Sequence, residues 1–354
     1  MSQSVIDYFG YTSEGWKKLN IVSDTTSNLV CSGIVMLELP STMLKNGSTM
    51  PNNSFWLSIG AGNNSDSYAK TTFLDTNGIL LSRVESTSTT NVNNEIKANT
   101  ISSTVNSIPE VAKIKQPFNS FGGKSFETKE DMNIRVSSRL KTKNRSVTSF
   151  DFYSLIEQEF SSVFYSKAFF NKSQNCTTIF LVKEMSDYQQ SNAFTPMVSE
   201  CVELKVQKYL EDKSSKAFPL KVTNFIFKYV KLKGVIKVNK KYQLKTAEQK
   251  INLLINVFLS PWIQSQQEQI IIDSGLSTSQ IASFINKTDF VDEVNGLQIY
   301  IGTKNQETWE IEYSENSFLR VVNDKTNVNN DCFLLNKGDL LVPSLDYLDI
   351  NYSK

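Results

Sequence analysis

The chain has 354 residues, enough for two or three domains of about 150 residues each. Its 37 lysines and arginines nearly balance its 36 aspartates and glutamates, so the net charge of +1 gives no general attraction for polyanions. It contains no histidine. A Ser-His-Asp or Cys-His catalytic centre is therefore excluded, and a zinc site would have to consist of cysteines alone.

The cysteines and the apolar segments exclude further classes of protein. Cys31, Cys176, Cys201 and Cys332 are scattered singly without a C-x-x-C pair, so we expect isolated reduced thiols and no metal. No apolar run reaches the roughly 18 residues of a membrane-spanning helix, so no membrane insertion is expected. The first residues lack the basic and apolar regions of a secretory signal, which predicts cytoplasmic synthesis and assembly.

Residues 1–110 are predicted to form a β-rich and polar region. Residues 32–40 predict a strand that stops at a proline, and residues 55–59 predict another. Two further short strands are expected at 72–74 and 79–84. Residues 86–94 are rich in Ser, Thr and Asn, which is typical of an exposed loop.

Residues 111–147 combine an aromatic, glycine-containing loop with a basic helix. The loop holds Phe118 and Phe121 and ends at Gly122 and Gly123, whose backbones adopt angles that other residues avoid. A helical period follows from residue 128 onwards.

This predicted helix has a narrow apolar stripe and an adjacent cationic row. The stripe consists of Met132, Val136 and Leu140, and the row consists of Arg135 and Arg139. Lys141, Lys143 and Arg145 extend the positive charge beyond it. From residue 113 to 145 there are nine Lys and Arg against three Asp and Glu, a local charge of 9 − 3 = +6. The charges indicate either a solvated helix face or a surface that meets an acidic partner.

Residues 148–303 alternate between helix and strand, which predicts mixed α/β layers with a possible break near residue 240. Three capping-box patterns predict helix starts: Thr148 with Asp151, Thr246 with Gln249, and Ser277 with Gln280. Strands are expected at 163–170, 178–183, 269–272 and, with an interruption at Gly234, 221–238. Asn295-Gly296 predicts a two-residue hairpin turn.

The tail, residues 304–354, returns to a β-like pattern. The sequence therefore predicts an α+β protein: a β-rich N-terminal region, then mixed α/β sandwich-like domains, then a β-rich C-terminal tail. The predicted division is 1–110, 111–147, 148–303 and 304–354.

None of the candidate chemical motifs is complete. Gly122-Gly123-Lys124-Ser125 resembles the end of a phosphate-binding loop, but the first glycine of that motif and its preceding apolar strand are missing. The three aspartates at 339, 346 and 349 fit neither a calcium loop nor a catalytic pair. We therefore expect no catalytic residue, no cofactor and no metal.

A second basic segment, residues 205–245, contains twelve lysines. Phe225, Phe227 and Tyr229 alternate within it and so share one face of a strand. They indicate either a packed core face or, as the less favoured alternative, a platform on which single-stranded nucleic acid would stack.

The sequence from residue 116 to 153 resembles the signature of the baseplate J-like proteins, which are wedge subunits of contractile phage tails and related injection systems. The similarity consists of Q-P-F at 116–118, S-F-G-G at 120–123, R-V-S-S-R-L at 135–140, K-N-R at 143–145 and F-D-F-Y at 150–153. L-S-P-W at 259–262 and F-V-D-E-V at 290–294 are also similar to family elements, so the resemblance covers most of residues 16–303.

This resemblance implies a structural protein without enzymatic activity. Its expected partners are a companion wedge subunit, a second copy of the chain, the hub and spike, and proteins near the sheath, with no nucleic acid among them. The interface would use Phe118, Phe121, Gly122, Gly123, Arg135, Arg139, Lys141, Lys143 and Arg145. The rival hypothesis is a surface module that binds carbohydrate or a receptor, suggested by the Asn, Ser and Thr content of the N-terminal third.

Overall fold

The computed structural model describes residues 6–45, 51–62, 68, 70–82, 95–121, 127–185, 194–263, 276–304, 311–313, 332–333 and 336–353. The fold is α+β, as predicted. The chain divides into two compact units, residues 1–139 and 140–354.

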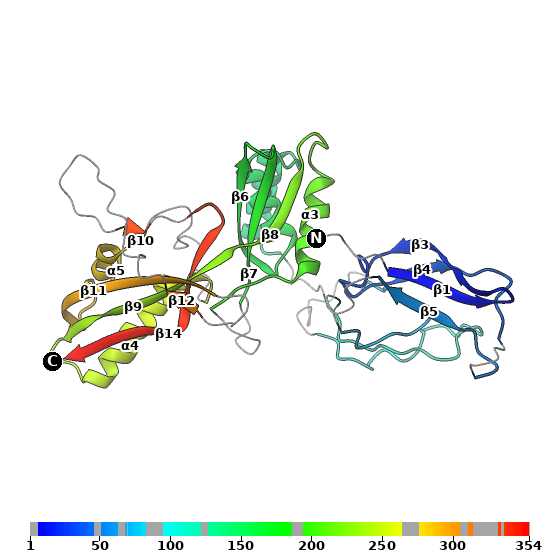
Figure 1. Ribbon diagram of the computed structural model, residues 1–354, viewed down its shortest axis with the longest axis horizontal. Coiled ribbons are helices and arrows are strands. Elements are labelled where there is room, and N and C mark those ends of the chain that lie inside the picture. The colour runs from blue at the N-terminus through cyan, green and yellow to red at the C-terminus, as the bar shows by residue number, and fades with distance from the viewer. Residues whose placement is uncertain are drawn as a thin grey trace. The chain divides into compact units, whose positions relative to one another are not determined.

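The first unit is built from two small antiparallel sheets (Figure 1). Strands β1 (Ile6–Thr12), β2 (Gly15–Lys18) and β5 (Leu57–Ala61) form one sheet in the order β2-β1-β5. Strands β3 (Asn20–Asp24) and β4 (Val35–Glu38) form the other. Alternate residues of β1 are buried, and Ile6, Tyr8 and Leu19 form the small core of this unit.

Two of the strands predicted in this unit do not form. β4 and β5 confirm the strands expected at 32–40 and 55–59. Residues 72–74 and 79–82 adopt no strand, and the remainder of the second segment lies outside the described residues. These segments have β-forming composition, but no neighbouring described strand pairs with them and their side chains are exposed.

The second unit begins with a three-stranded sheet covered by two helices. β6 (Val163–Asn171), β7 (Cys176–Lys183) and β8 (Leu220–Asn224) lie in the order β6-β7-β8. Helices α2 (Ser149–Glu159) and α3 (Glu200–Glu211) bury one stripe each against them, with Ile156, Val206 and Leu210 almost fully buried. The capping box of Thr148 and Asp151 starts α2 as predicted.

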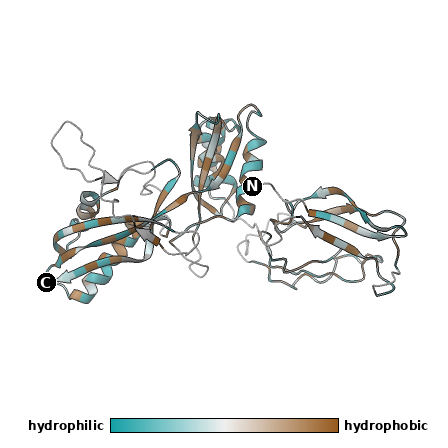
Figure 2. Cartoon of the chain, in the orientation of Figure 1, coloured by the Kyte–Doolittle hydropathy of each residue, from teal (hydrophilic) through white to brown (hydrophobic). Residues whose placement is uncertain are grey.

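The rest of the second unit is a four-stranded sheet in the order β12-β11-β9-β14. Its strands are β9 (Ile226–Val238), β11 (Val291–Lys304), β12 (Ile311–Tyr313) and β14 (Asp339–Ser353). β14 lies parallel to β9, whereas β11 is antiparallel to it. Figure 2 shows hydrophobic and hydrophilic residues alternating along these strands, as expected where one face of a sheet is buried.

Two helices cover that buried face. They are α4 (Leu244–Leu259) and α5 (Thr278–Asn286), and their residues Ile251, Ile255, Ile281 and Ile285 share one core with β9 and β11. α4 ends before the 3-10 turn Pro261–Ile263, as the proline predicts. The third predicted capping box, Ser277 with Gln280, is confirmed at α5, next to the short pair β10 (Leu276–Ser277) and β13 (Cys332–Phe333).

Three local predictions for this unit are wrong. Asn295-Gly296 makes no hairpin, because β11 runs through it and uses the positive φ of Gly296 (+59°) in an irregularity of the ladder. Thr246 does not cap α4, because the helix begins two residues earlier at Leu244. The break between β8 and β9 lies at Phe225, whereas Gly234 is inside β9, where it allows the backbone of Leu297 to approach.

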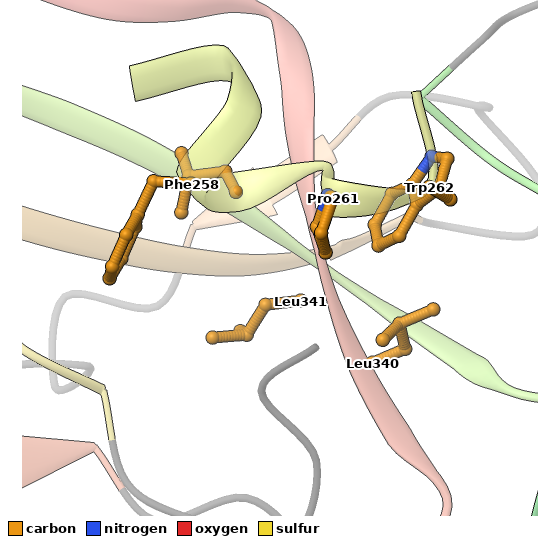
Figure 3. A pocket seen from close by; sticks show the side chains of 6 residues that line it. Phe258, Pro261, Trp262, Leu340 and Leu341 are labelled. Carbon is orange, nitrogen blue, oxygen red and sulfur yellow. The ribbon is translucent and has the colours of Figure 1, made fainter. Parts of the chain in front are cut away.

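The aromatic residues at 225, 227 and 229 belong to a core. Phe225 is buried, and Phe227 and Tyr229 pack against the cluster that contains Trp262, Leu340 and Val342. Figure 3 shows Trp262 and Leu340 beside a pocket that Phe258, Leu259, Pro261 and Leu341 complete. Because hydrophobic side chains line this pocket, it offers no charged group for a ligand. The stacking platform for nucleic acid is thus contradicted.

Among the described cysteines, Cys176 is a free thiol, as predicted. Cys31 and Cys201 are disulfide-bonded, so the prediction of isolated thiols is wrong for these two.

Candidate assembly interface

Helix α1 (Lys129–Thr142) is the predicted basic helix, and its start is fixed by Thr128. The Thr128 hydroxyl accepts a hydrogen bond from the backbone N–H of Asp131 (3.1 Å), and the Asp131 carboxylate accepts hydrogen bonds from the Thr128 hydroxyl (2.6 Å) and backbone N–H (3.3 Å). This is a reciprocal cap with aspartate in the third position. It satisfies two donors that would otherwise lack partners at the helix N-terminus.

The apolar stripe of α1 is not buried. Met132 and Val136 are each 42% exposed and Leu140 is 73% exposed, whereas the only buried residue of the described helix is Thr142. Helices of this length are marginal in water without tertiary packing. A capped helix whose apolar residues face solvent therefore has the properties of an element that packs against another protein.

The two arginines of the predicted row have different surroundings. The Arg135 guanidinium donates two hydrogen bonds to the Glu127 carboxylate, at 2.6 Å from Nε and 2.9 Å from Nη2. These bonds lower the pKa of Glu127 and raise the pKa of Arg135. Arg139, one turn later, is exposed and forms no ion pair with another described residue. Arg139 is thus the more available cation for a partner.

The turn that follows α1 is held by contacts within residues 140–354. Lys143 and Asn144 both have positive φ angles (51° and 54°), which stop the helix. Asn144 accepts a hydrogen bond from the Lys213 ammonium (3.0 Å), and the buried Ser146 hydroxyl donates to the carbonyl of Leu210 (2.9 Å). The backbone of this turn is therefore fixed, and the side chains of Lys143 and Arg145 are exposed on it.

Lys141 lies with its ammonium 5.8 Å from the centre of the Phe150 ring. Phe150 is 47% exposed at the first turn of α2, so the pair forms an aromatic and cationic surface at the start of the second unit. No spacing rule predicts this contact from the sequence.

The polar side chains of the Q-P-F-N-S-F segment, residues 116–121, form hydrogen bonds with the backbone of residues 95–101. The Gln116 side chain accepts a hydrogen bond from the N–H of Ile101 (2.9 Å) and donates to the carbonyl of Phe118 (3.0 Å). Asn119 accepts from the N–H of Ala98, and Ser120 accepts from the N–H of Ile96, both at 2.8 Å. These bonds join residues 95–101 to residues 116–120 in the absence of a regular ladder.

The two phenylalanines of this segment have different environments. Phe118 packs edge to face on Phe73, with ring centroids 5.4 Å apart, whereas Phe121 is 80% exposed. Gly122 and Gly123 lie outside the described residues. Within the described part of the chain, no hydrogen bond, ion pair or ring contact joins these phenylalanines to the cations of α1. The structure therefore places the predicted interface residues in two groups, a loop group and a helix group.

The described residues contain no group of three or more Cys, Asp and Glu that could bind a metal ion. No helix among them is both long and apolar enough to cross a membrane.

The exposed, capped helix α1, with its apolar stripe, is thus the candidate interface. The sequence matches the family described as "Baseplate protein PVC11-like" over residues 5–322, so the chain belongs to that family. This match confirms the expectation of a contractile injection system baseplate protein.

Among solved structures, the chain is similar to one described as the cryo-EM structure of the anti-feeding prophage (AFP) baseplate, 6-fold symmetrised. The TM-score is 0.47 at 10% sequence identity, covering 97% of this chain and 74% of the other. This similarity is too distant to support an argument about function. A comparison with curated protein sequences finds no relative.

Proposed function

We propose that this chain is a wedge subunit of a phage-tail-like baseplate. It would assemble with a companion wedge protein and a second copy of itself around the hub and spike, without catalytic activity. The family match over residues 5–322 supports the baseplate role, and the resemblance of residues 116–153 to the baseplate J-like signature supports the wedge assignment. Assembly would take place in the cytoplasm, and the chain would become part of the particle.

One observation identifies the residues expected at the interface. Helix α1 is capped at its start and its following turn is fixed, yet its apolar stripe is exposed. Burying Met132, Val136 and Leu140 against a partner would remove this stripe from water. Arg139, Lys141, Lys143 and Arg145 lie in the second half of the helix and the turn beyond it. We therefore expect the partner surface to be apolar along the stripe and acidic near the helix C-terminus.

The Glu127–Arg135 pair would act within the subunit. Since Arg135 already binds Glu127, its charge is partly satisfied before any partner arrives. Its role in the interface would be to hold the segment before α1 against the helix. Arg139 and Lys141 would carry the attraction.

The test is incorporation of charge-reversed chains into baseplates. Arg139→Glu with Lys141→Glu should leave the fold intact, because both side chains are exposed, and should reduce incorporation into assembled particles at least tenfold. Lys245→Glu is the matched control, an exposed lysine on α4 given the same change. The chain would be quantified by mass spectrometry against sheath and spike proteins in purified particles.

Two outcomes would refute parts of the proposal. Normal incorporation of the double variant would remove α1 from the interface. Absence of the wild-type chain from particles that hold another wedge subunit would remove the wedge assignment.

A further inference from the structure

The first unit contains a segment that has the sequence of a strand but no sheet. Residues Ile79, Leu80 and Leu81 are 76%, 75% and 69% exposed. No hydrogen bond joins their backbone N–H and C=O groups to any described residue. A run of apolar residues is typical of a strand that is buried on both faces, because successive side chains point to opposite sides.

The beginning of this segment is held in place. Phe73 packs on Phe118, and the Asp75 carboxylate forms an ion pair with the Lys115 ammonium at 3.3 Å. Asn77 adopts a positive φ (57°) and is followed by Gly78, so the chain turns there. Residues 79–81 therefore extend from a fixed turn. We call residues 76–82 the arm.

The chemistry of the arm restricts what can cover it. A hydrophobic groove would bury the side chains but would leave the backbone N–H and C=O groups of three residues without partners. An open edge of a β-sheet satisfies those groups and the side chains together. The partner of the arm is therefore a sheet edge beside which hydrophobic residues are exposed.

Strand β5 of the same unit presents such an edge. It pairs with β1 on one side, and no described strand lies on its other side. Leu57 and Ile59 point to the same face as Ile6 and Tyr8, because Tyr8 is paired with Ile59, yet they are 44% and 42% exposed. The core face of the sheet thus continues to β5, where both of these side chains remain exposed.

The opposite face of β5 carries Ser58 and Gly60, and its hydrophobic contribution comes from Phe9 of β1. A Cβ atom added to Gly60 would lie 3.4 Å from the Phe9 ring, so this ring extends over the edge strand. An added strand could place Ile79 and Leu81 beside Leu57 and Ile59, and Leu80 beside Phe9. All three consecutive hydrophobic residues of the arm would then be buried.

We infer that the arm of one copy adds as a strand to the β5 edge of a second copy. Donor and acceptor lie on the same unit, so the contact is heterologous and can repeat from copy to copy around a ring. This inference rests on the proposed function, because the baseplate supplies the copies that meet.

The experiment places a photo-crosslinking phenylalanine analogue at Leu80, with a matched probe at Thr76 in the turn. Baseplates are assembled from an equal mixture of isotopically heavy and light chains, and cross-linked peptides are identified by mass spectrometry. We expect position 80 to cross-link to the β5 peptide, with half of the cross-links joining heavy to light chains. The probe at 76 should give at least fivefold fewer.

Other cross-links overturn the inference in defined ways. Links within one chain only would mean that the arm folds back on its own unit. Links to a different subunit would mean that the acceptor is not a second copy. If the probe itself prevents assembly, amide hydrogen exchange of wild-type baseplates decides, since unprotected residues 79–81 would refute strand addition.

Failure of the proposed function is distinguishable from failure of this inference. If the chain is absent from baseplates, the wedge proposal fails, and the same mixed-isotope cross-link is measured with the purified chain at high concentration. A heavy-to-light link there would still support the arm, whereas its absence would overturn it.

Discussion

Gly338 offers a direct test of how the two sheets of the second unit are packed together. Its φ is +89°, a conformation that disfavours residues with a Cβ, and an added Cβ would lie 2.5 Å from the Phe180 ring. That ring cannot move freely, because it packs against both Phe169 and Phe225. The carbonyl of Gly338 also accepts the N–H of Ile226 at the start of β9.

Gly338→Ala should therefore impose two costs. The left-handed backbone contributes about 1–2 kcal/mol, and overpacking against Phe180 contributes about 1–3 kcal/mol. Their sum, about 2–5 kcal/mol, is a large part of the stability of a typical domain. The control is Gly296→Ala, where φ is +59° and nothing lies within 4 Å of an added Cβ, so only the backbone cost applies.

The assay is unfolding in urea, monitored by the amide hydrogen exchange of β9 and β14. The exchange of these two strands reports the free energy of unfolding of this sheet directly. The alanine at 338 should lower that free energy by at least about 1 kcal/mol more than the alanine at 296, the smallest overpacking cost. Equal losses in the two variants would refute the claim that Phe180 fills the space in front of Gly338.

Three further predictions concern the remaining elements. Burial raises the pKa of Glu203, although a hydrogen bond from Asn224 acts in the opposite direction. The free energy of unfolding of the second unit should therefore decrease as pH rises from about 4 through that raised pKa. Glu203→Gln should flatten this pH dependence, and an unchanged profile would contradict the prediction. Burial opposes ionisation of Asp24, but hydrogen bonds from Thr26 and Asn28 lower its pKa overall. The first unit should then lose stability as pH falls below about 4, and in Asp24→Asn this acid loss should shrink. Gln116→Ala should free residues 95–101, measured as at least tenfold faster amide exchange at Ile101; retained protection would mean that the Gln116 side chain does not hold this segment.

The sequence predicted best the elements whose signals are local. The caps at Thr148 and Ser277 and the stop at Pro261 depend on residues within one helical turn, and all three were confirmed. The Asn295-Gly296 prediction was wrong for a nonlocal reason. The same dipeptide suits a turn or a strand irregularity, and its pairing with β9 selects the second.

The residues of the candidate site could be predicted from the sequence, but the residues that their side chains contact could not. The periodicity identified the stripe of α1, yet whether such a stripe is covered depends on partners far away in sequence or in another chain. The bond between Arg135 and Glu127 spans eight residues and crosses the helix start, so no helical spacing rule predicts it. The same holds for Gln116, whose partners lie 15 and 20 residues upstream.

The position of β14 constrains the order in which the chain acquires its structure during synthesis. β9 has its parallel neighbour only when residues 339–353 have left the ribosome, since Asp339 pairs with Ile226 and Ser353 with Lys237. The backbone ladders of the sheet β6-β7-β8 involve no residue beyond Asn224, so its strands can pair earlier. Until then β9 keeps an open edge rich in valine, isoleucine and leucine, which is prone to aggregation. A chain whose synthesis stops before residue 353 would therefore expose this adhesive edge, so β14 determines when the newly made subunit becomes safe to accumulate.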